Sequence, residues 1–370
     1  MTKIIQISGD SSSTGAPSHV LRLSKGLKDN GCEVVLIAPK GPLVKKIQEL
    51  GIKTYEVRMR GFFDRNADHK IREIIKSELP DIVHCHGTRG GWLGRLAARK
   101  VEGVKVVYTE HLWTEYFHLP NYAIEKFQLN GLKFMERWTD KTIAVSESVK
   151  DFLVSRGFNK DRIIVIPNGV DPQFLSHKII DKPQDAPLVI GSVGSLNQIK
   201  NYRNAILAIS KIKKKYPNYN FHYQIIGEGP LLGGLKNLAR IKKVEKRVHF
   251  AGRVDSVVER LQHFSIFLNV SLSESFGLAV GEAMAMGLPI VASDIKPLKW
   301  LVSKDCGFFV NPRSPDQIAQ ALEKLLFDKS LRKQMGERAK NRIANKFSEQ
   351  AMVKKINDLY TDLLSDKARR

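Results

Sequence analysis

Short runs of β-branched and other apolar residues alternate along this chain with longer stretches in which apolar positions recur at helical spacing. In the first half these stretches predict helices such as Ser18–Asn30, Ile71–Leu79 and Thr88–Lys100. The short runs predict strands at Lys3–Ser8, Glu33–Ala38, Asp81–Cys85, Lys105–Tyr108, Thr142–Val145 and Ile163–Ile166. Such alternation is typical of a parallel sheet with helices on both faces.

The alternation restarts after a polar stretch, Ser176 to Ala186, which is predicted to be a linker. A second series of strands is predicted at Leu188–Val193, Phe221–Ile226, Val248–Ala251, Ile266–Val270, Pro289–Ala292 and Gly307–Val310. We therefore expect an α/β protein with two doubly wound, Rossmann-like domains. The first domain is expected over residues 1–172 and the second over residues 173–347.

Two late helices are marked by local signals. Ser314 is predicted to cap a helix that has Pro315 at its first position and Gln317 placed for a capping box. The last helix, from about Ser348, carries an apolar stripe of Met352, Ile356, Leu359 and Leu363. We expect the segment 348–370 to pack back on the first domain, because something must cover this stripe.

Composition narrows the class of protein. Hydrophobic residues make up 42% and charged residues 26% of the 370 residues, which is ordinary for a globular protein and excludes disordered, collagen-like and coiled-coil classes. Three widely spaced cysteines predict neither a disulfide framework nor a cysteine-based zinc site. The start resembles a strand rather than a signal peptide, and the apolar segment Phe276–Ala292 is too short and too broken to span a membrane. A cytoplasmic location is expected.

The net charge is +22, from 60 basic and 38 acidic residues. A charge of this size predicts a negatively charged partner: nucleic acid, an anionic membrane surface or a phosphate-rich substrate. Charge alone does not choose among these.

The segment after the strand Ile266–Val270 carries two glutamates, Glu274 and Glu282. A helix predicted from near Ser275 would offer free amide N–H groups to an anion. Eight helical positions span ~12 Å, whereas the paired carboxyls of retaining glycosidases lie only ~5.5 Å apart. The spacing favours two carboxylates holding opposite ends of a long ligand. The alternative is a pair of surface glutamates flanking a buried helix.

A second candidate anion site follows the first strand of the second domain. The segment Val193–Asn201 contains Gly194, Ser195 and Lys200 at the strand end where open α/β sheets bind ligands. Lys200 could neutralise a phosphate, or it could be an ordinary solvated lysine at a helix start.

These motifs resemble the large GT-B-fold family of retaining glycosyltransferases that use nucleoside-diphosphate sugars (glycosyl transferases group 1, family 4-like). The resemblance extends over essentially the whole chain. Further stretches match in family order: Ala144–Ser148, Ile166–Asp171, Ile226–Pro230 and Val248–Arg253. It implies two Rossmann-like domains facing a central cleft.

The resemblance also implies roles for individual residues. Glu282 would bind the ribose hydroxyls, Glu274 the hydroxyls of the donor sugar, and Lys200 the diphosphate leaving group. The implied donor-binding set is Gly15, Gly194, Ser195, Arg253, Val254, Phe276, Gly277, Leu278 and Glu282. The implied catalytic set is His111, Glu274 and Lys200. Ser195 departs from the family, which often has an arginine there, so a second cation for the diphosphate must come from elsewhere or is absent.

Histidines of the first domain raise the question of a metal. His84 and His86 share one strand end, but the sequence offers no third ligand beside them, so no metal site is expected. His19 is expected to pack rather than react. His111 directly follows a strand, and family members often have a histidine there near the donor sugar. It is assigned to sugar positioning, with a hydrogen-bonded structural histidine as the alternative.

Basic and aromatic residues are mixed in the first domain. Arg58, Arg60 and Arg65 surround Phe62 and Phe63. Another loop contributes Trp113, Tyr116, Phe117 and Tyr122. Exposed aromatics among cations suit an anionic membrane surface. The alternative is that the aromatics are core and the arginines solvated.

We therefore expect a retaining hexosyltransferase that takes its donor as a nucleoside-diphosphate sugar, with UDP favoured over GDP. The expected acceptor is lipid-linked or a growing surface polysaccharide, at the inner face of the cell membrane. No metal cofactor and no nucleic-acid partner are expected. The alternatives are a sugar-nucleotide epimerase on the same fold and a non-catalytic nucleic-acid-binding protein.

Overall fold

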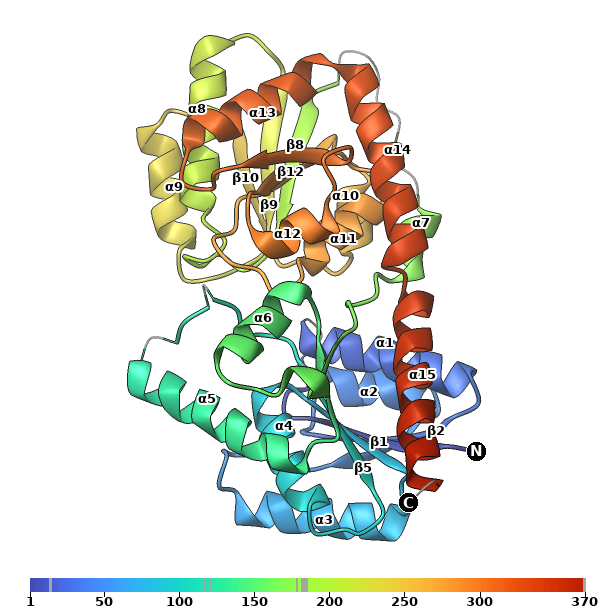
Figure 1. Ribbon diagram of the computed structural model, residues 1–370. Coiled ribbons are helices and arrows are strands. Elements are labelled where there is room, and N and C mark those ends of the chain that lie inside the picture. The colour runs from blue at the N-terminus through green and yellow to red at the C-terminus, as the bar shows by residue number, and fades with distance from the viewer. Residues whose placement is uncertain (13–14, 116, 120, 178, 181–185, 369–370) are drawn as a thin grey trace. The chain divides into compact units, whose positions relative to one another are not determined.

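The computed structural model describes residues 1–12, 15–115, 117–119, 121–177, 179–180 and 186–368 (Figure 1). The chain forms two compact units, one of Met1–Gly169 with Glu349–Arg370 and one of Val170–Ser348. The first boundary thus follows Gly169 rather than residue 172. Most of the predicted linker around residues 181–185 lies outside the described residues.

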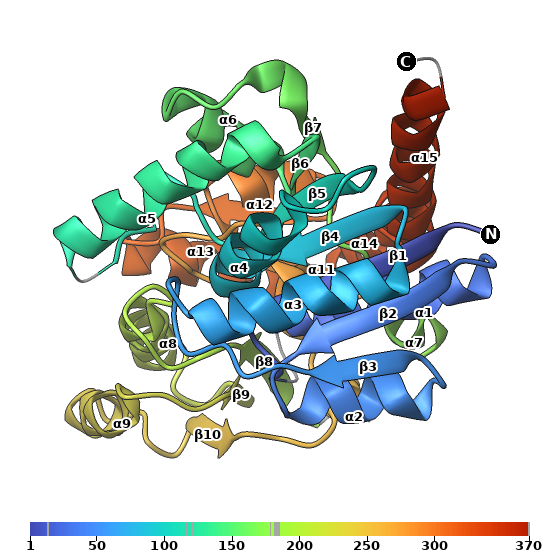
Figure 2. The same ribbon diagram turned by 90° about the horizontal axis from the view of Figure 1, so that it is seen from below.

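The first unit is built on one parallel sheet. Its elements are β1 (Lys3–Ser8), α1 (Ala16–Asp29), β2 (Glu33–Ala38), α2 (Pro42–Glu49), β3 (Lys53–Glu56), α3 (Arg65–Glu78), β4 (Ile82–His86), α4 (Gly87–Ala98), β5 (Lys105–Glu110), α5 (Tyr122–Met135), η1 (Glu136–Trp138), β6 (Lys141–Ala144), α6 (Glu147–Ser155), η2 (Lys160–Arg162), β7 (Ile163–Val165) and α15 (Glu349–Ala368). The seven strands lie in the order β3-β2-β1-β4-β5-β6-β7, as Figure 2 shows. In the centre, Ile5 of β1 pairs with Val35 of β2 and Val83 of β4.

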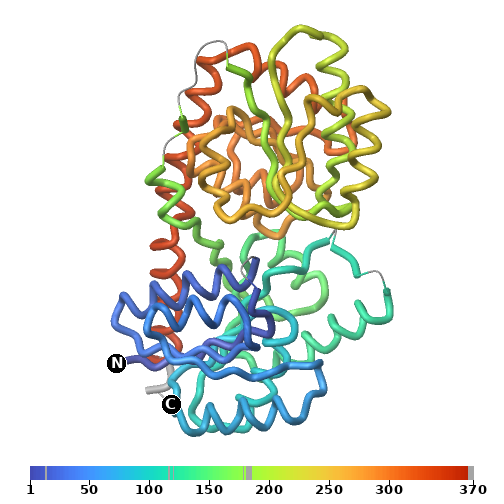
Figure 3. Tube along the Cα trace, turned by 180° about the vertical axis from the view of Figure 1, so that it is seen from behind, coloured from blue at the N-terminus to red at the C-terminus, as the bar shows by residue number. Residues whose placement is uncertain are grey.

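Helices cover both faces of this sheet. The last helix, α15, lies beside α1 and the N-terminal strands (Figure 3), and its apolar residues share a core with α1, α2 and one face of the sheet. Gly26 lets α1 and α15 approach closely, since a Cβ there would lie 2.5 Å from Val353 Cγ2. On the other face α4 packs against Cys85 and Tyr108, where Gly94 and Gly91 leave no room for a side chain.

The second unit repeats the plan with a six-stranded parallel sheet. Its elements are α7 (Pro172–Ser176), β8 (Leu188–Val193), α8 (Tyr202–Lys215), β9 (Phe221–Ile226), α9 (Leu232–Ile241), β10 (Val248–Gly252), α10 (Val257–Leu261), β11 (Ile266–Asn269), α11 (Leu278–Ala285), β12 (Ile290–Ser293), α12 (Lys296–Leu301), β13 (Gly307–Val310), α13 (Pro315–Phe327) and α14 (Lys329–Lys346). The strand order is β10-β9-β8-β11-β12-β13. Apolar residues of α8, α9 and α13 form one core with the strands. The predicted fold class, two doubly wound Rossmann-like domains, is confirmed.

Some local predictions were wrong. Ser314 caps α13 as predicted, through the Gln317 amide, but the Gln317 side chain accepts the Asn311 N–H at 2.9 Å and closes no capping box. The helix expected from Ser275 begins at Leu278. The apolar segment 276–292 folds as α11 and β12, and no helix among the described residues is long and apolar enough to cross a membrane.

Candidate active site

A lysine and a glutamate meet at one edge of the second sheet. β8 and β11 are neighbours, so the loops that follow them begin side by side. Lys200 Nζ lies 2.6 Å from Glu274 Oε1, and Asn269 Nδ2 donates to the same oxygen at 3.2 Å. The two side chains keep only 23% and 11% of their surface exposed. The fold thus joins two residues of the predicted catalytic set that are distant in sequence.

The pair fixes the charge of Glu274. Burial works against an ionised carboxyl, but the Lys200 ammonium and hydrogen bonds from Lys200, Ser271 and Asn269 hold the pKa of Glu274 below its ordinary value. The carboxylate is therefore ionised at neutral pH. An ammonium has three N–H donors, so Lys200 can hold Glu274 and still donate to a phosphate oxygen.

Two glycine-bearing loops lie against each other beside this pair. A Cβ on Gly227 would lie 2.1 Å from the Gly194 carbonyl oxygen, and one on Gly229 would lie 2.6 Å from the Leu196 oxygen. Gly194 has a φ of 153° and Gly227 one of 140°, values that side chains disfavour. The loops after β8 and β9 therefore meet backbone to backbone, which leaves Ser195 exposed at the surface.

The N-terminus of α11 follows Glu274 closely. Gly277, with a φ of 92°, precedes the first helical residue, Leu278, and among the described residues no side chain caps this end. The Phe276 ring is buried against Trp300 and Phe347, so this side chain is part of the hydrophobic core. Since the helix starts at Leu278, its free amides begin there rather than at Phe276. The ~12 Å helical spacing expected between the two glutamates does not apply either, because Glu274 precedes the helix.

The remaining predicted residues of the second unit lie on nearby segments. Glu282 is half-buried on α11. Arg253 and Val254 follow β10; the Arg253 amide donates to Glu228 Oε1 at 3.4 Å, and Val254 is half-buried. Glu228 thus connects the loop after β9 to the loop after β10 through this hydrogen bond, a role that sequence patterns did not indicate.

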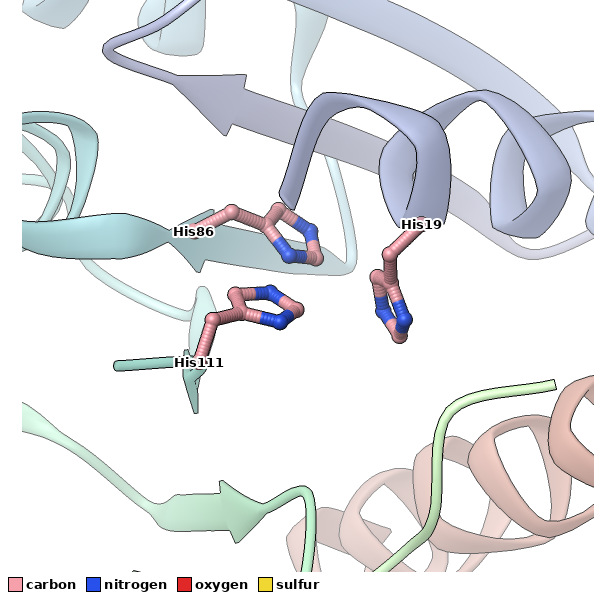
Figure 4. A group of neighbouring side chains, drawn as sticks. All are labelled: His19, His86 and His111. Carbon is pink, nitrogen blue, oxygen red and sulfur yellow. The ribbon is translucent and has the colours of Figure 1, made fainter. Parts of the chain in front are cut away.

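In the first unit, three histidines converge (Figure 4). His19 extends from α1, His86 ends β4 and His111 follows β5. Their ring centroids lie 4.8 Å apart for His19 and His111, 5.5 Å for His19 and His86, and 5.8 Å for His86 and His111. Gly15, with a φ of 70°, is exposed at the start of α1.

The expectation for the pair of histidines on β4 was wrong in detail. Both ring nitrogens of His84 are hydrogen-bonded, to the Tyr360 hydroxyl at 2.5 Å and to the Thr109 hydroxyl at 2.6 Å, so His84 is a structural residue. His86 does have close histidine neighbours, but they come from α1 and from the end of β5. No spacing pattern in the sequence links these positions.

Burial sets the protonation of the cluster. It lowers the pKa of His19 and His86 well below the usual value and that of His111 to about 4. All three imidazoles are therefore neutral at pH 7. Glu110 accepts the Leu112 N–H at 2.8 Å and so holds the turn that carries His111.

Acidification is expected to destabilise the first unit through these histidines. Between pH 6.5 and 4 the unfolded state binds a proton at position 111 and the folded state does not, so the free energy of unfolding falls as pH falls. Between pH 7.5 and 5.0 the free energy of unfolding of the His111→Asn variant should fall by about 2 kcal/mol less than that of the wild-type protein. Urea denaturation followed by tryptophan fluorescence measures this, with exposed His69→Asn as control. An unchanged loss in His111→Asn contradicts the burial argument.

The aromatic residues of the first unit divide into core and surface. Trp113 is fully buried, as in the alternative that places the aromatics in the core, and Tyr116 lies outside the described residues. Phe117 is half-buried and packs on Trp113. Two of the predicted aromatics are exposed, Phe63 in the loop before α3 and Tyr122 at the start of α5. Further exposed apolar side chains on α5 are Ile124, Phe127 and Phe134. We call these five residues the α5 surface.

Comparison with known proteins identifies the class. Solved structures match nearly the whole chain: a glycosyltransferase from Rickettsia africae (TM-score 0.82, 22% identity, 98% of each chain) and Anabaena HepE in complex with UDP and glucose (TM-score 0.84, 17% identity, 98% of this chain and 100% of that one). Such matches, together with the two parallel-sheet units, define the GT-B fold. Models of two families match, Glycosyltransferase Family 4 over residues 13–174 and Glycosyl transferases group 1 over residues 175–342. The two models match consecutive segments that together extend over residues 13–342, so the chain belongs to the glycosyltransferases that carry both.

Curated relatives agree on the class. A UDP-Gal:alpha-D-GlcNAc-diphosphoundecaprenol alpha-1,3-galactosyltransferase of Escherichia coli is 29% identical over 80% of this chain and 79% of its own length. An N-acetyl-alpha-D-glucosaminyl L-malate synthase of Bacillus anthracis is 25% identical over 93% of both chains. The predicted glycosyltransferase family is confirmed, whereas retention and the roles of single residues stay predictions.

Proposed function

We propose that this chain is a retaining glycosyltransferase that moves a hexose from a nucleoside diphosphate, UDP in preference to GDP, to a lipid-linked acceptor or a growing surface polysaccharide. The observation that carries the proposal is the Lys200–Glu274 pair beside the uncapped start of α11. The named substrates of the Escherichia coli relative, a UDP-sugar and a diphosphoundecaprenol-linked sugar, support the donor and acceptor classes.

The roles we propose follow from the chemistry of each group. Lys200 and the first amides of α11 stabilise the charge that develops on the departing diphosphate, which is electrostatic catalysis. Glu274 accepts hydrogen bonds from sugar hydroxyls, and Glu282 accepts them from the ribose. Neutral His111 positions the donor sugar. Transfer needs no metal ion at the diphosphate, because these groups supply the positive charge.

Product stereochemistry tests the proposal. We expect that incubation with a UDP-hexose and a polyprenyl-diphosphate-linked sugar gives a glycoside with the anomeric configuration of the donor. The proton coupling constant at the new anomeric carbon measures this. An inverted product contradicts retention, and conversion of the donor without acceptor favours an epimerase.

We further propose that the α5 surface docks on the cytoplasmic face of an anionic membrane, rather than on nucleic acid. Phe63 is 74% exposed and lies 5.8 Å, ring to ring, from Phe127 of α5, so loop and helix form one apolar patch. Exposed Lys126 lies on the same helix, and Arg137 follows it with its guanidinium 3.9 Å from the Phe134 ring centre. Apolar side chains among cations bind an anionic interface both by burying apolar surface and by electrostatic attraction to the anionic lipids.

Vesicle flotation tests this surface. The double substitution Phe63→Ser/Phe127→Ser is expected to weaken partition onto vesicles containing anionic lipid by about tenfold or more, because burial of each phenylalanine contributes roughly 1.5–3 kcal/mol when complete. The substitution Ile241→Ser removes an apolar side chain that is 61% exposed on the second unit and should leave partition unchanged. Equal partition of both variants and wild type contradicts docking through this surface.

A further inference from the structure

The histidine cluster of the first unit, His19, His86 and His111, contains ring nitrogens that have no hydrogen-bond partner among the described residues. Among the described residues, Nε2 of His19, Nε2 of His111 and both ring nitrogens of His86 are buried without a hydrogen-bond partner. Unpaired buried nitrogens are costly, and native proteins seldom keep several of them together. One potential ligand atom from each ring lies within 4.8 Å of the other two. This concentration of unused lone pairs points to a ligand.

The orientation of His19 favours a metal ion as that ligand. Its Nδ1 donates to Asn168 Oδ1 at 2.9 Å, which leaves the lone pair on Nε2, and this nitrogen has no partner among the described residues. Metal-binding histidines usually donate their second ring N–H to an oxygen in this way, which fixes the tautomer.

We propose that His19, His86 and His111 bind one divalent transition-metal ion, for which Zn²⁺ is the probe. Three imidazoles form a common ligand set for zinc, and they leave a fourth position open for water. Zinc–nitrogen bonds of ~2.0–2.1 Å in a tetrahedron place the nitrogens about 3.4 Å apart, so the rings close by no more than about 1.4 Å. Small side-chain rotations supply this movement.

The three ligands all belong to the first unit, so zinc binding does not require the diphosphate-binding groups proposed for the second unit. It has one consequence that rests on the proposed function. His111 cannot position a sugar while its nitrogen holds an ion, so Zn²⁺ should inhibit transfer reversibly.

Competition with a chromophoric chelator, without donor or acceptor, tests the site. We expect one Zn²⁺ per chain, with affinity reduced 100-fold or more in His86→Leu and about tenfold or more in Asn168→Ala, which removes only the oxygen that orients His19. His86→Leu breaks no hydrogen bond found among the described residues, so the variant is expected to fold. The double substitution His222→Ala/His249→Ala is the control, because it removes a surface histidine pair 3.1 Å apart on the second unit.

A second measurement needs no variant. Co²⁺ bound to wild-type protein through three imidazoles should show the visible absorption of a low-coordinate site, and Zn²⁺ should displace it. Zinc affinity equal in wild type and His86→Leu, or lost only in the His222/His249 control, overturns the proposal. Absence of bound Zn²⁺ and of the Co²⁺ bands also overturns it and leaves the transferase proposal untouched.

Discussion

The substitution Lys200→Met is expected to lower kcat/KM for sugar transfer by about 10²–10³-fold, the effect of removing one group that stabilises transition-state charge. Methionine keeps the length of the side chain and removes the charge. Because the leaving diphosphate gains charge as the sugar departs, the loss should fall mainly on kcat. Initial rates at varied donor concentration measure both constants.

Stability separates this effect from damage to the fold. Lys200→Met leaves Glu274 largely buried without its counter-charge, so the single variant should also unfold more easily. The double substitution Lys200→Met/Glu274→Gln removes both charges and should recover stability without recovering transfer. Lys214→Met, at an exposed lysine of α8, is the matched control. A double variant that transfers at the wild-type rate contradicts the proposed role of the pair.

The substitution Glu282→Ala is expected to raise KM for the donor by about 100-fold or more. A carboxylate that accepts hydrogen bonds from two ribose hydroxyls contributes ~1.5–3 kcal/mol through each. The base and ribose are remote from the reacting carbon, so kcat should change far less than KM. Glu245→Ala, at an exposed glutamate of the same unit, should leave KM unchanged. A loss confined to kcat contradicts ribose binding.

Hydrophobic patterning predicted the fold well where strands are buried. Central strands of a parallel sheet are buried on both faces, so they form nearly continuous apolar runs in the sequence. For this reason β1, β2, β8 and β9 have the predicted bounds. The edge strand β3 was missed because Lys53–Glu56 is partly exposed and has no apolar run. The start of α11 was misplaced because the left-handed Gly277 delays the helix, a choice that tertiary packing makes.

The candidate site was predictable only where its residues share one segment. Glu274, Gly277 and Glu282 form a local motif, and the motif suggested an anion site. The bond between Lys200 and Glu274 depends on β8 and β11 being adjacent, which chain order does not specify. The contact of His19 with His86 and His111 likewise needs the tertiary fold, since no periodic pattern joins them.

The central claim is that the second unit binds a nucleotide sugar through Glu282, and calorimetric titration with UDP, GDP and ADP tests it most directly. We predict micromolar binding of UDP to the wild-type protein, weaker binding of GDP and ADP, and loss of UDP binding in Glu282→Ala. Binding of no nucleotide, or UDP binding that is equally tight in Glu282→Ala, would contradict the claim.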